Sequence, residues 1–514
     1  CDNNVSSIQI KMPFVKEVRK STTGITNCNF RFEYLANFGV QYNFNVLSIA
    51  LLFLSNDQVW YNEDKWGGSI SSILKSIIFA GAIFGMCIMG FIGDIVGRNH
   101  AFALTSMIMV GFSLMSAFAP WGSNGDIALI ILAIARFGLG FGIGGCYPLS
   151  AAKSAENGDL RSGAQRNINV GLNLLFQAIG NIAPYLLALI IDGFDSPIWK
   201  FRICLGLGAL PPFIVLIATY GAEESTEYKS AKLKRSLSKS RSNIVDSVVE
   251  EAMEMHPIEN SRDHHTCSNE LVKTSCFSMI LEHINIGLEE KGITKKIIAT
   301  AVGWLIYDIG YYGSLAFTPK ITSIMFDNER KDNEGVNMSH IAIQGMIATS
   351  VGVPGVISAL YLLSRIGTKA LSIWGFLLIA VASAILAIAW RPVDDSWTLF
   401  GLFVLLTFSV NWGPNLTTFV LPQEVFPVEI RATFNGFAAA CGKLGALIGI
   451  WIFEKISEEF GIVPLMVIVC ILNIIGAIIS QTCISDDLWK TQLASEAEKK
   501  AEKSHVENKA NAKG

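Results

Sequence analysis

Twelve apolar segments run along this chain, and each is long enough to cross the roughly 30 Å hydrocarbon core of a bilayer as a helix. Helices satisfy their own backbone hydrogen bonds, as a spanning segment in lipid must. We therefore expect an all-α membrane protein with twelve transmembrane helices in two six-helix halves. The segments lie near residues 34–54, 69–92, 100–119, 126–149, 166–191 and 199–220, and near 297–317, 340–364, 369–391, 396–420, 431–454 and 459–483.

The composition supports a polytopic membrane protein. Of 514 residues, 51% are hydrophobic and only 16% are charged, against about 25% charged in soluble domains. The net charge of −3 favours no nucleic-acid partner, and the ten cysteines show neither a CxxC motif nor zinc spacing. The chain has no P-loop, dinucleotide-binding fingerprint or HExxH motif. We expect no metal, no cofactor and no enzymatic activity.

Polar stretches and basic loops divide and orient the chain. The stretch between the two groups of segments opens basic and turns acidic, and it is too polar to fold alone. By the positive-inside rule, we expect both termini and this linker in the cytosol. We also expect the plasma membrane rather than an organelle. The expected parts are a cytosolic N-terminal segment (1–33), a six-helix bundle (34–220), a cytosolic linker (221–296), a second bundle (297–483) and a cytosolic tail (484–514). The basic residues that set the orientation are Arg98, Lys153, Arg161, Arg166, Arg365, Lys369 and Arg431.

Asp308 is the one acid in the apolar segment near 297–317. A carboxyl group at that depth is costly unless it is paired or hydrated, so it indicates a functional site. Trp304 and Tyr312 lie one helical turn before and after it, on the same helix face. Lys443 lies about a dozen residues into another apolar segment and also needs a partner. We predict that Asp308 and Lys443 pair.

A short turn motif follows the second segment and recurs, weakly, after the eighth. The first copy is Gly90-x-x-x-Asp94-x-x-Gly97-Arg98, and the second contains Arg365 and Gly367. Matching turns in two six-helix halves are typical of a duplicated transporter. We expect Asp94 and Arg98 to pair with neighbouring helix ends in one gating state.

Two further sets of charged residues are candidates for function. Glu424 and Arg431 flank the loop after segment ten, and we predict a cytosolic ion pair with a gating role. Arg136 begins a glycine-rich stretch from within the apolar region. It is either a functional buried charge or a side chain that snorkels to the interface.

Several motifs together resemble the phosphate:proton symporter branch of the major facilitator superfamily. They are Gly144-Gly145-x-Tyr147-Pro148-Leu149-Ser150, Trp304-x3-Asp308-x3-Tyr312-Gly313, Gly413-Pro414-Asn415-x-Thr417-Thr418-Phe419, Pro422-x-Glu424-Val425-Phe426-Pro427 and Gly442-Lys443. The resemblance implies rocking-bundle alternating access with inorganic phosphate bound between the halves. It assigns phosphate contacts to Tyr147, Gln177, Trp304, Asp308, Tyr312, Asn415 and Lys443.

The chain departs from that family where acids are usual. Amides stand at Asn43 and Asn45 in the first segment, Thr105 replaces an acid in the third, and Cys146 replaces one in the fourth. Those acids are thought to form the family's proton path. The resemblance therefore leaves Asp308, with Arg136, as the candidate proton-coupling group, and we hypothesise that anion binding persists while coupling is altered or lost.

These observations predict a secondary active transporter of inorganic phosphate, coupled to protons unless the missing acids have abolished coupling. Its expected partners are phosphate, protons and the lipid bilayer. Two alternatives stay open. One is a transporter of another small solute, such as an organic anion or a sugar. The other is a transporter-like receptor or subunit of a membrane complex that does not itself transport.

Overall fold

The computed structural model describes most of the two predicted bundles. Outside the ranges given below it describes only a few isolated positions between 222 and 289. The predicted N-terminal segment, linker and tail fall mostly outside the described residues, so the boundaries of the five parts stay predictions. The described ranges are 31–54, 69–119, 125–156, 163–220, 292–325, 338–391 and 395–485.

The first half consists of helices that follow its six predicted segments. The sixth segment forms two helices, because Pro211 and Pro212 supply no backbone N–H at the start of the second. The helices are α2 (Phe32–Leu54), α4 (Ser69–Ile95), α5 (Arg98–Phe118), α6 (Gly125–Glu156), α7 (Gly163–Ile191), α8 (Pro197–Leu207) and α9 (Leu210–Thr219).

The second half repeats this arrangement with more interruptions. Segment ten forms two helices because Gly413 has a φ of +80° and Pro414 follows it. The elements are α12 (Ile293–Ile297), the π-helical turn η1 (Ile298–Val302), α13 (Gly303–Met325), α14 (Met338–Ser350), α15 (Gly352–Ala389), α16 (Ser396–Asn411), α17 (Pro414–Val425), α18 (Arg431–Glu459) and α19 (Ile462–Cys483).

Ten helical stretches among the described residues are long and apolar enough to span a membrane. One of them, Ser339–Ala389, contains both the eighth and the ninth predicted segments. The seventh predicted segment corresponds to η1 and α13. Each predicted segment is therefore helical, and the predicted all-α membrane fold is confirmed.

The predicted repeat appears in the backbone. Gly97, between α4 and α5, has a φ of +133°, and Gly367, inside the stretch assigned to α15, has a φ of +79°. Residues other than glycine rarely adopt these angles, so each glycine permits a sharp turn between two antiparallel helices. The two turns occupy corresponding places in the two halves, which supports a duplicated architecture.

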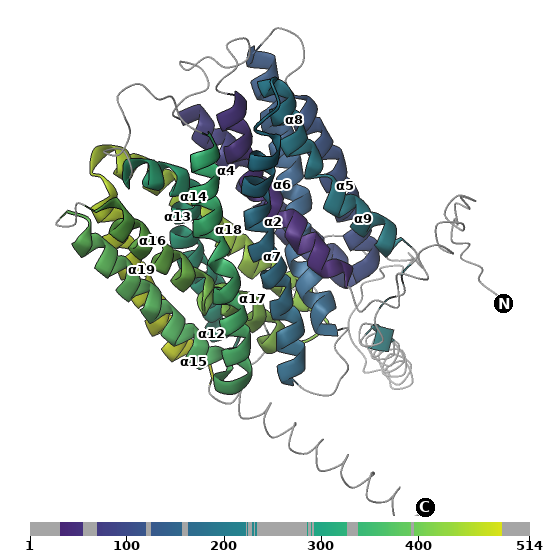
Figure 1. The fold of residues 1–514 in the computed structure, drawn as a ribbon. Coiled ribbons are helices and arrows are strands. Elements are labelled where there is room, and N and C mark those ends of the chain that lie inside the picture. The colour runs from purple at the N-terminus through teal and green to yellow at the C-terminus, as the bar shows by residue number, and fades with distance from the viewer. Residues whose placement is uncertain are drawn as a thin grey trace, which may run out of the picture.

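The two halves lie side by side (Figure 1). Helix α18 of the second half lies along α4 of the first, and α14 and α15 lie along α7. The approach of α18 to α4 depends on glycine. A Cβ on Gly436 would lie 2.3 Å from the Met86 carbonyl oxygen, and a Cβ on Gly90 would lie 2.5 Å from the Ala432 carbonyl oxygen. Both distances are too short for a carbon–oxygen contact.

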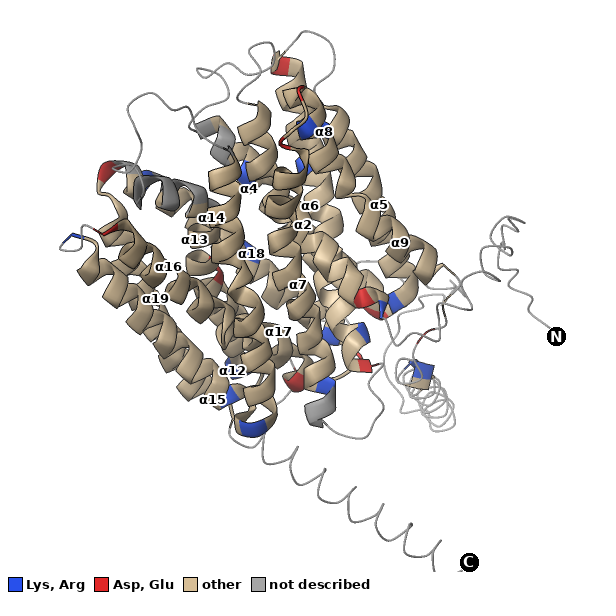
Figure 2. Ribbon diagram, in the orientation of Figure 1, with Lys and Arg blue, Asp and Glu red and all other residues tan. Residues whose placement is uncertain are grey.

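Charged residues lie mainly toward the ends of the bundle, and most of the length of its helices holds none (Figure 2). One end contains the starts of α5 and α18 and the Gly367 turn. We call it the basic end, because Arg98, Arg365 and Arg431 lie there. It matches the set of loops that the positive-inside rule assigns to the cytosol.

Substituting Gly436 tests the close approach of the halves. Gly436→Ala should destabilise the purified protein by about 1–3 kcal/mol, because the added methyl group has no room against α4. Gly401→Ala is the matched control, since a Cβ there has open space around it. Thermal unfolding in detergent measures both. Equal midpoints for the two variants would contradict the described packing.

Candidate functional site

The centre of the site is an ion pair inside the second half, between two of its helices. Lys443 on α18 places its Nζ 3.0 Å from Oδ2 of Asp308 on α13. Both residues are 1% exposed. Lys443 Nζ also donates to the Tyr312 hydroxyl at 2.8 Å. The predicted Asp308–Lys443 pair is confirmed, and each charge offsets the other's cost of burial.

Aromatic rings surround the Lys443 ammonium. Its Nζ lies 4.0 Å from the centroid of the Tyr312 ring, 4.8 Å from that of Tyr147 and 5.4 Å from that of Phe44. Tyr147 belongs to α6 and Phe44 to α2, so the first half supplies part of this wall. Ring faces attract a cation, and this attraction strengthens where water is excluded.

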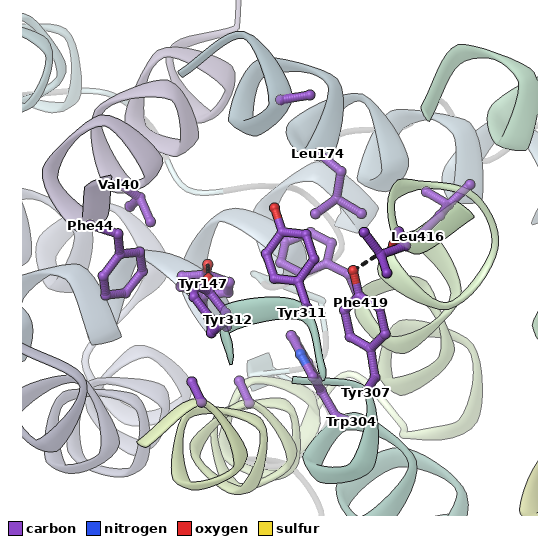
Figure 3. Close-up of a cluster of buried hydrophobic side chains, with 14 of the residues drawn as sticks. Val40, Phe44, Tyr147, Leu174, Trp304, Tyr307, Tyr311, Tyr312, Leu416 and Phe419 are labelled. Carbon is purple, nitrogen blue, oxygen red and sulfur yellow. Dashed lines mark hydrogen bonds between the residues drawn. The ribbon is translucent and has the colours of Figure 1, made fainter. Parts of the chain in front are cut away.

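The same aromatic cluster joins the halves across the middle of the molecule (Figure 3). The hydroxyls of Tyr147 and Tyr312 lie 3.3 Å apart. The Trp304 ring lies 6.4 Å from that of Tyr147, and Phe419 packs edge-on against both. Gly442 makes room for Trp304, since a Cβ there would lie 2.6 Å from the indole Cδ1.

Five of the predicted phosphate contacts therefore meet in one place, and two do not. Gln177 Nε2 donates to Asn37 Oδ1 at 2.7 Å, within the first half. Asn415 Nδ2 donates to Asn411 Oδ1 at 3.3 Å, on the second half's interior. Their role in phosphate binding stays a prediction. The residues that meet are Tyr147, Trp304, Asp308, Tyr312 and Lys443.

Gln177 belongs to a run of amides that sequence inspection missed. Asn37 and Asn45 on α2 contact Asn173, Gln177 and Asn181 on α7, and within each helix these residues are spaced four or eight apart. Asn37 Nδ2 donates to Asn173 Oδ1 at 3.1 Å, and Asn45 Nδ2 donates to Asn181 Oδ1. The repeated spacing of four was the signal for this amide ladder, since it places side chains on one helix face.

The amide ladder reaches the second half at Tyr311. Asn181 Nδ2 donates to the Tyr311 hydroxyl at 3.2 Å, and the Tyr311 ring packs edge-on against Tyr312 at 4.9 Å. The ladder therefore reaches the second half through a neutral hydrogen bond, and Tyr311 reaches the Lys443 site through ring packing. Amides do not titrate in the physiological range, so this connection does not gain or lose protons.

Arg136 lies apart from this site. It is buried on α6, and its Nη2 donates to the Asn43 carbonyl oxygen at 2.6 Å. It does not snorkel to the interface. Among the described residues no carboxylate pairs with Arg136, and its contacts do not include Asp308. A role in proton coupling stays a prediction.

Asp94 and Arg98 form a bridge between the halves at the basic end. Arg98 pairs with Asp94 and, at 3.0 Å, with Glu156. Arg98 Nη2 also donates to the Val428 carbonyl oxygen at 3.3 Å. Asp94 Oδ2 accepts from the backbone N–H and the hydroxyl of Thr433, at 2.7 and 2.6 Å. The predicted pairing with neighbouring helix ends is confirmed, and its gating role stays a prediction.

Glu424 and Arg431 contact different parts of the basic end, and their predicted ion pair with a gating role stays a prediction. Glu424 Oε1 accepts from the Thr368 hydroxyl at 2.8 Å and from Asn167 Nδ2. Arg431 Nε donates to the Phe426 carbonyl oxygen at 3.3 Å. Arg431 binds the preceding turn, whereas Glu424 faces α7 and α15. The Glu424–Asn167 contact is a second bridge between the halves.

The opposite end of the bundle is also bridged. The Ser339 hydroxyl on α14 donates to Asp192 Oδ2, after α7, at 2.7 Å. Tyr185 on α7 packs so closely on Gly345 that a Cβ there would lie 2.2 Å from its ring. With bridges at both ends, the Asp308–Lys443 pair lies enclosed in the middle, which is the arrangement expected of an occluded state.

Comparison with known proteins identifies the architecture. A sequence model of the Major Facilitator Superfamily matches residues 34–450. Among solved structures, the proton:xylose symporter XylE bound to 6-bromo-6-deoxy-D-glucose has a TM-score of 0.67 at 16% identity, over 87% of this chain and 93% of that one. At this identity the similarity concerns the fold.

Among curated proteins the chain is similar to several named as phosphate transporters. It is 30% identical to inorganic phosphate transporter PT2 of Toxoplasma gondii, over 87% of this chain and 70% of that protein. It is 28% identical to probable inorganic phosphate transporter 1-6 of Arabidopsis thaliana, over 80% of this chain and 81% of that protein.

A double-mutant cycle tests the central pair. Lys443→Met alone should destabilise the protein by about 3–5 kcal/mol, because it leaves Asp308 buried without its cation. Adding Asp308→Asn should recover much of that loss, since the double variant buries no charge. Unfolding of the four purified proteins in denaturant measures the cycle. Additive losses would contradict a direct pair.

Proposed function

Because the chain belongs to the Major Facilitator Superfamily, we propose that this integral multi-pass membrane protein is a secondary transporter of inorganic phosphate that works by alternating access. The observation that carries the proposal is the buried Asp308–Lys443 pair among tyrosine hydroxyls where the halves meet. The names of the relatives support phosphate as the cargo.

The site offers phosphate a cation and several neutral donors. Lys443 has three N–H donors and two described partners, Asp308 and Tyr312, so one donor is available to an anion. Tyr147, Tyr312 and Trp304 add O–H and N–H groups from both halves. An oxyanion with four oxygens accepts donors from several directions, and bonds that involve a charged donor are the strongest of these.

Asp308 gives the site selectivity among oxyanions. Phosphate near neutral pH retains P–O–H groups that donate to a carboxylate, whereas sulfate carries no proton. A buried carboxylate facing sulfate would meet only negative oxygens, which is costly in a site that excludes water. We expect the protein to transport phosphate in the presence of excess sulfate.

Alternating access requires the two sets of bridges to break in turn. Opening the basic end separates Asp94 from Thr433 and Arg98 from the Val428 carbonyl. The proposed gating residues are therefore Asp94, Arg98 and Glu424, with Arg431 shaping the loop after α17. We place the basic end in the cytosol, following the distribution of Lys and Arg. We also propose the plasma membrane as the location of the protein.

Proton coupling, in this proposal, depends on Asp308. The other buried carboxylates among the described residues, Glu33, Asp94 and Glu156, lie at the basic end. In the middle of the first half, the positions near Lys443 and the amide ladder hold neutral side chains such as Asn43, Asn45 and Cys146. Asp308 is then the group that exchanges a proton with the cargo or with water when the site opens.

Phosphate uptake into proteoliposomes tests the proposal. Lys443→Ala should lower uptake about 10-fold or more, because it removes a charge-assisted hydrogen bond to the anion. Asp308→Asn should abolish any stimulation by an inward proton gradient. The matched controls are Lys455→Ala and Asp195→Asn, which change exposed residues.

The results distinguish proton-coupled phosphate transport from the alternatives. Saturable uptake by the wild type that ignores the pH gradient would support uncoupled transport at the same site. If Lys443→Ala takes up phosphate as well as the two control variants do, the assigned site is wrong. A folded wild type that binds and transports no phosphate would overturn the proposal in favour of another cargo or a non-transporting role.

A further inference from the structure

Arg136 is a buried cation that its surroundings do not neutralise. Three cationic side chains among the described residues are less than 2% exposed, namely Arg98, Arg136 and Lys443. Arg98 pairs with Asp94 and Glu156, and Lys443 pairs with Asp308. For Arg136 the described residues supply no carboxylate.

The hydrogen bonds of Arg136 are also incomplete. Its Nη2 donates to the Asn43 carbonyl oxygen, but Nε and Nη1 have no acceptor among the described residues. The Asn43 side chain does not fill the gap, because its Nδ2 donates to the carbonyls of Gly39 and Gly208. Its Oδ1 is directed toward Gly208, where a Cβ would lie 2.2 Å away, and has no donor.

A guanidinium group stays protonated in proteins, so Arg136 cannot escape this cost by losing a proton. A buried charge needs a counter-charge and partners for its donors. Two nitrogens with free N–H groups and one uncompensated positive charge are the complement of a small anion. One elementary charge calls for a monovalent ion, and the close packing around Asn43 and Gly208 calls for a small one.

We propose that Arg136 holds a small inorganic anion of the chloride class between α6 and α2, as a structural counter-ion in the first half. The ion takes the place that a carboxylate near Asn43 would otherwise fill. This site is separate from the Asp308–Lys443 pair and does not depend on phosphate being the cargo. It makes the stability of the first half sensitive to the anion in solution.

Thermal unfolding of the full-length protein in detergent tests the proposal. Chloride replaces gluconate at constant ionic strength and without phosphate. We expect the wild-type midpoint to rise with chloride and to saturate, as it does when a ligand binds the native state alone. Arg136→Lys keeps the charge and should keep a response. Arg136→Gln should lose it, whereas the exposed control Arg391→Gln should respond as the wild type does.

A second variant keeps the proposal testable if Arg136→Gln does not fold. Asn43→Asp loses the Nδ2 hydrogen bonds to the Gly39 and Gly208 carbonyls, and we expect its carboxylate to turn toward the guanidinium and to abolish the response to chloride. An unresponsive wild type, or a response that survives in Arg136→Gln or in Asn43→Asp, would overturn the proposal.

A further experiment with phosphate shows whether the Arg136 site binds phosphate as well as chloride. Phosphate replaces chloride in the Lys443→Ala background, where the other anion site is disabled. A rise in midpoint that adding Arg136→Gln removes would assign phosphate, as a small inorganic anion, to the Arg136 site as well. No rise with phosphate, together with the chloride response, would assign the site to chloride alone.

Discussion

The ion pair between Asp308 and Lys443 is the interaction on which the interior of this protein depends. Either charge alone would be costly among apolar helices, and together they fix α13 against α18. Tyr312 and Tyr147 then extend the pair's hydrogen bonds to the first half. An anion that enters this site meets an ammonium group already placed and desolvated, which is the preorganisation that tight anion binding needs.

The polar contacts elsewhere in the molecule differ in kind from this ion pair. Along α2 and α7 the polar contacts are amides, which hold the helices without changing charge. At the basic end the charged side chains of Asp94 and Arg98 join the halves through hydrogen bonds to Thr433 and to the Val428 carbonyl oxygen. In the proposed transport cycle the amide contacts between α2 and α7 persist, whereas the hydrogen bonds that join the halves form and break. The molecule thus separates rigid packing within a half from contacts that open.

Much of this arrangement could be predicted from the sequence, for definite physical reasons. Apolar length predicts the spanning helices, and the high cost of lone buried charges predicts that Asp308 and Lys443 pair. The amide contacts could not be predicted in the same way. An amide accepts many partners, so the partner of Gln177 depends on which helix lies opposite it. The contact of Glu424 with the amide of Asn167 could not be predicted for the same reason, since these residues lie 257 positions apart in sequence.

Equilibrium binding of radiolabelled phosphate to the purified protein tests the central claim most directly. The wild type should bind phosphate saturably, with sulfate a poor competitor. Lys443→Ala should weaken binding about 10-fold or more, while Lys455→Ala should leave it unchanged. Phosphate binding of equal affinity in the wild type and in folded Lys443→Ala would contradict the account, because the anion would then occupy some other part of the molecule.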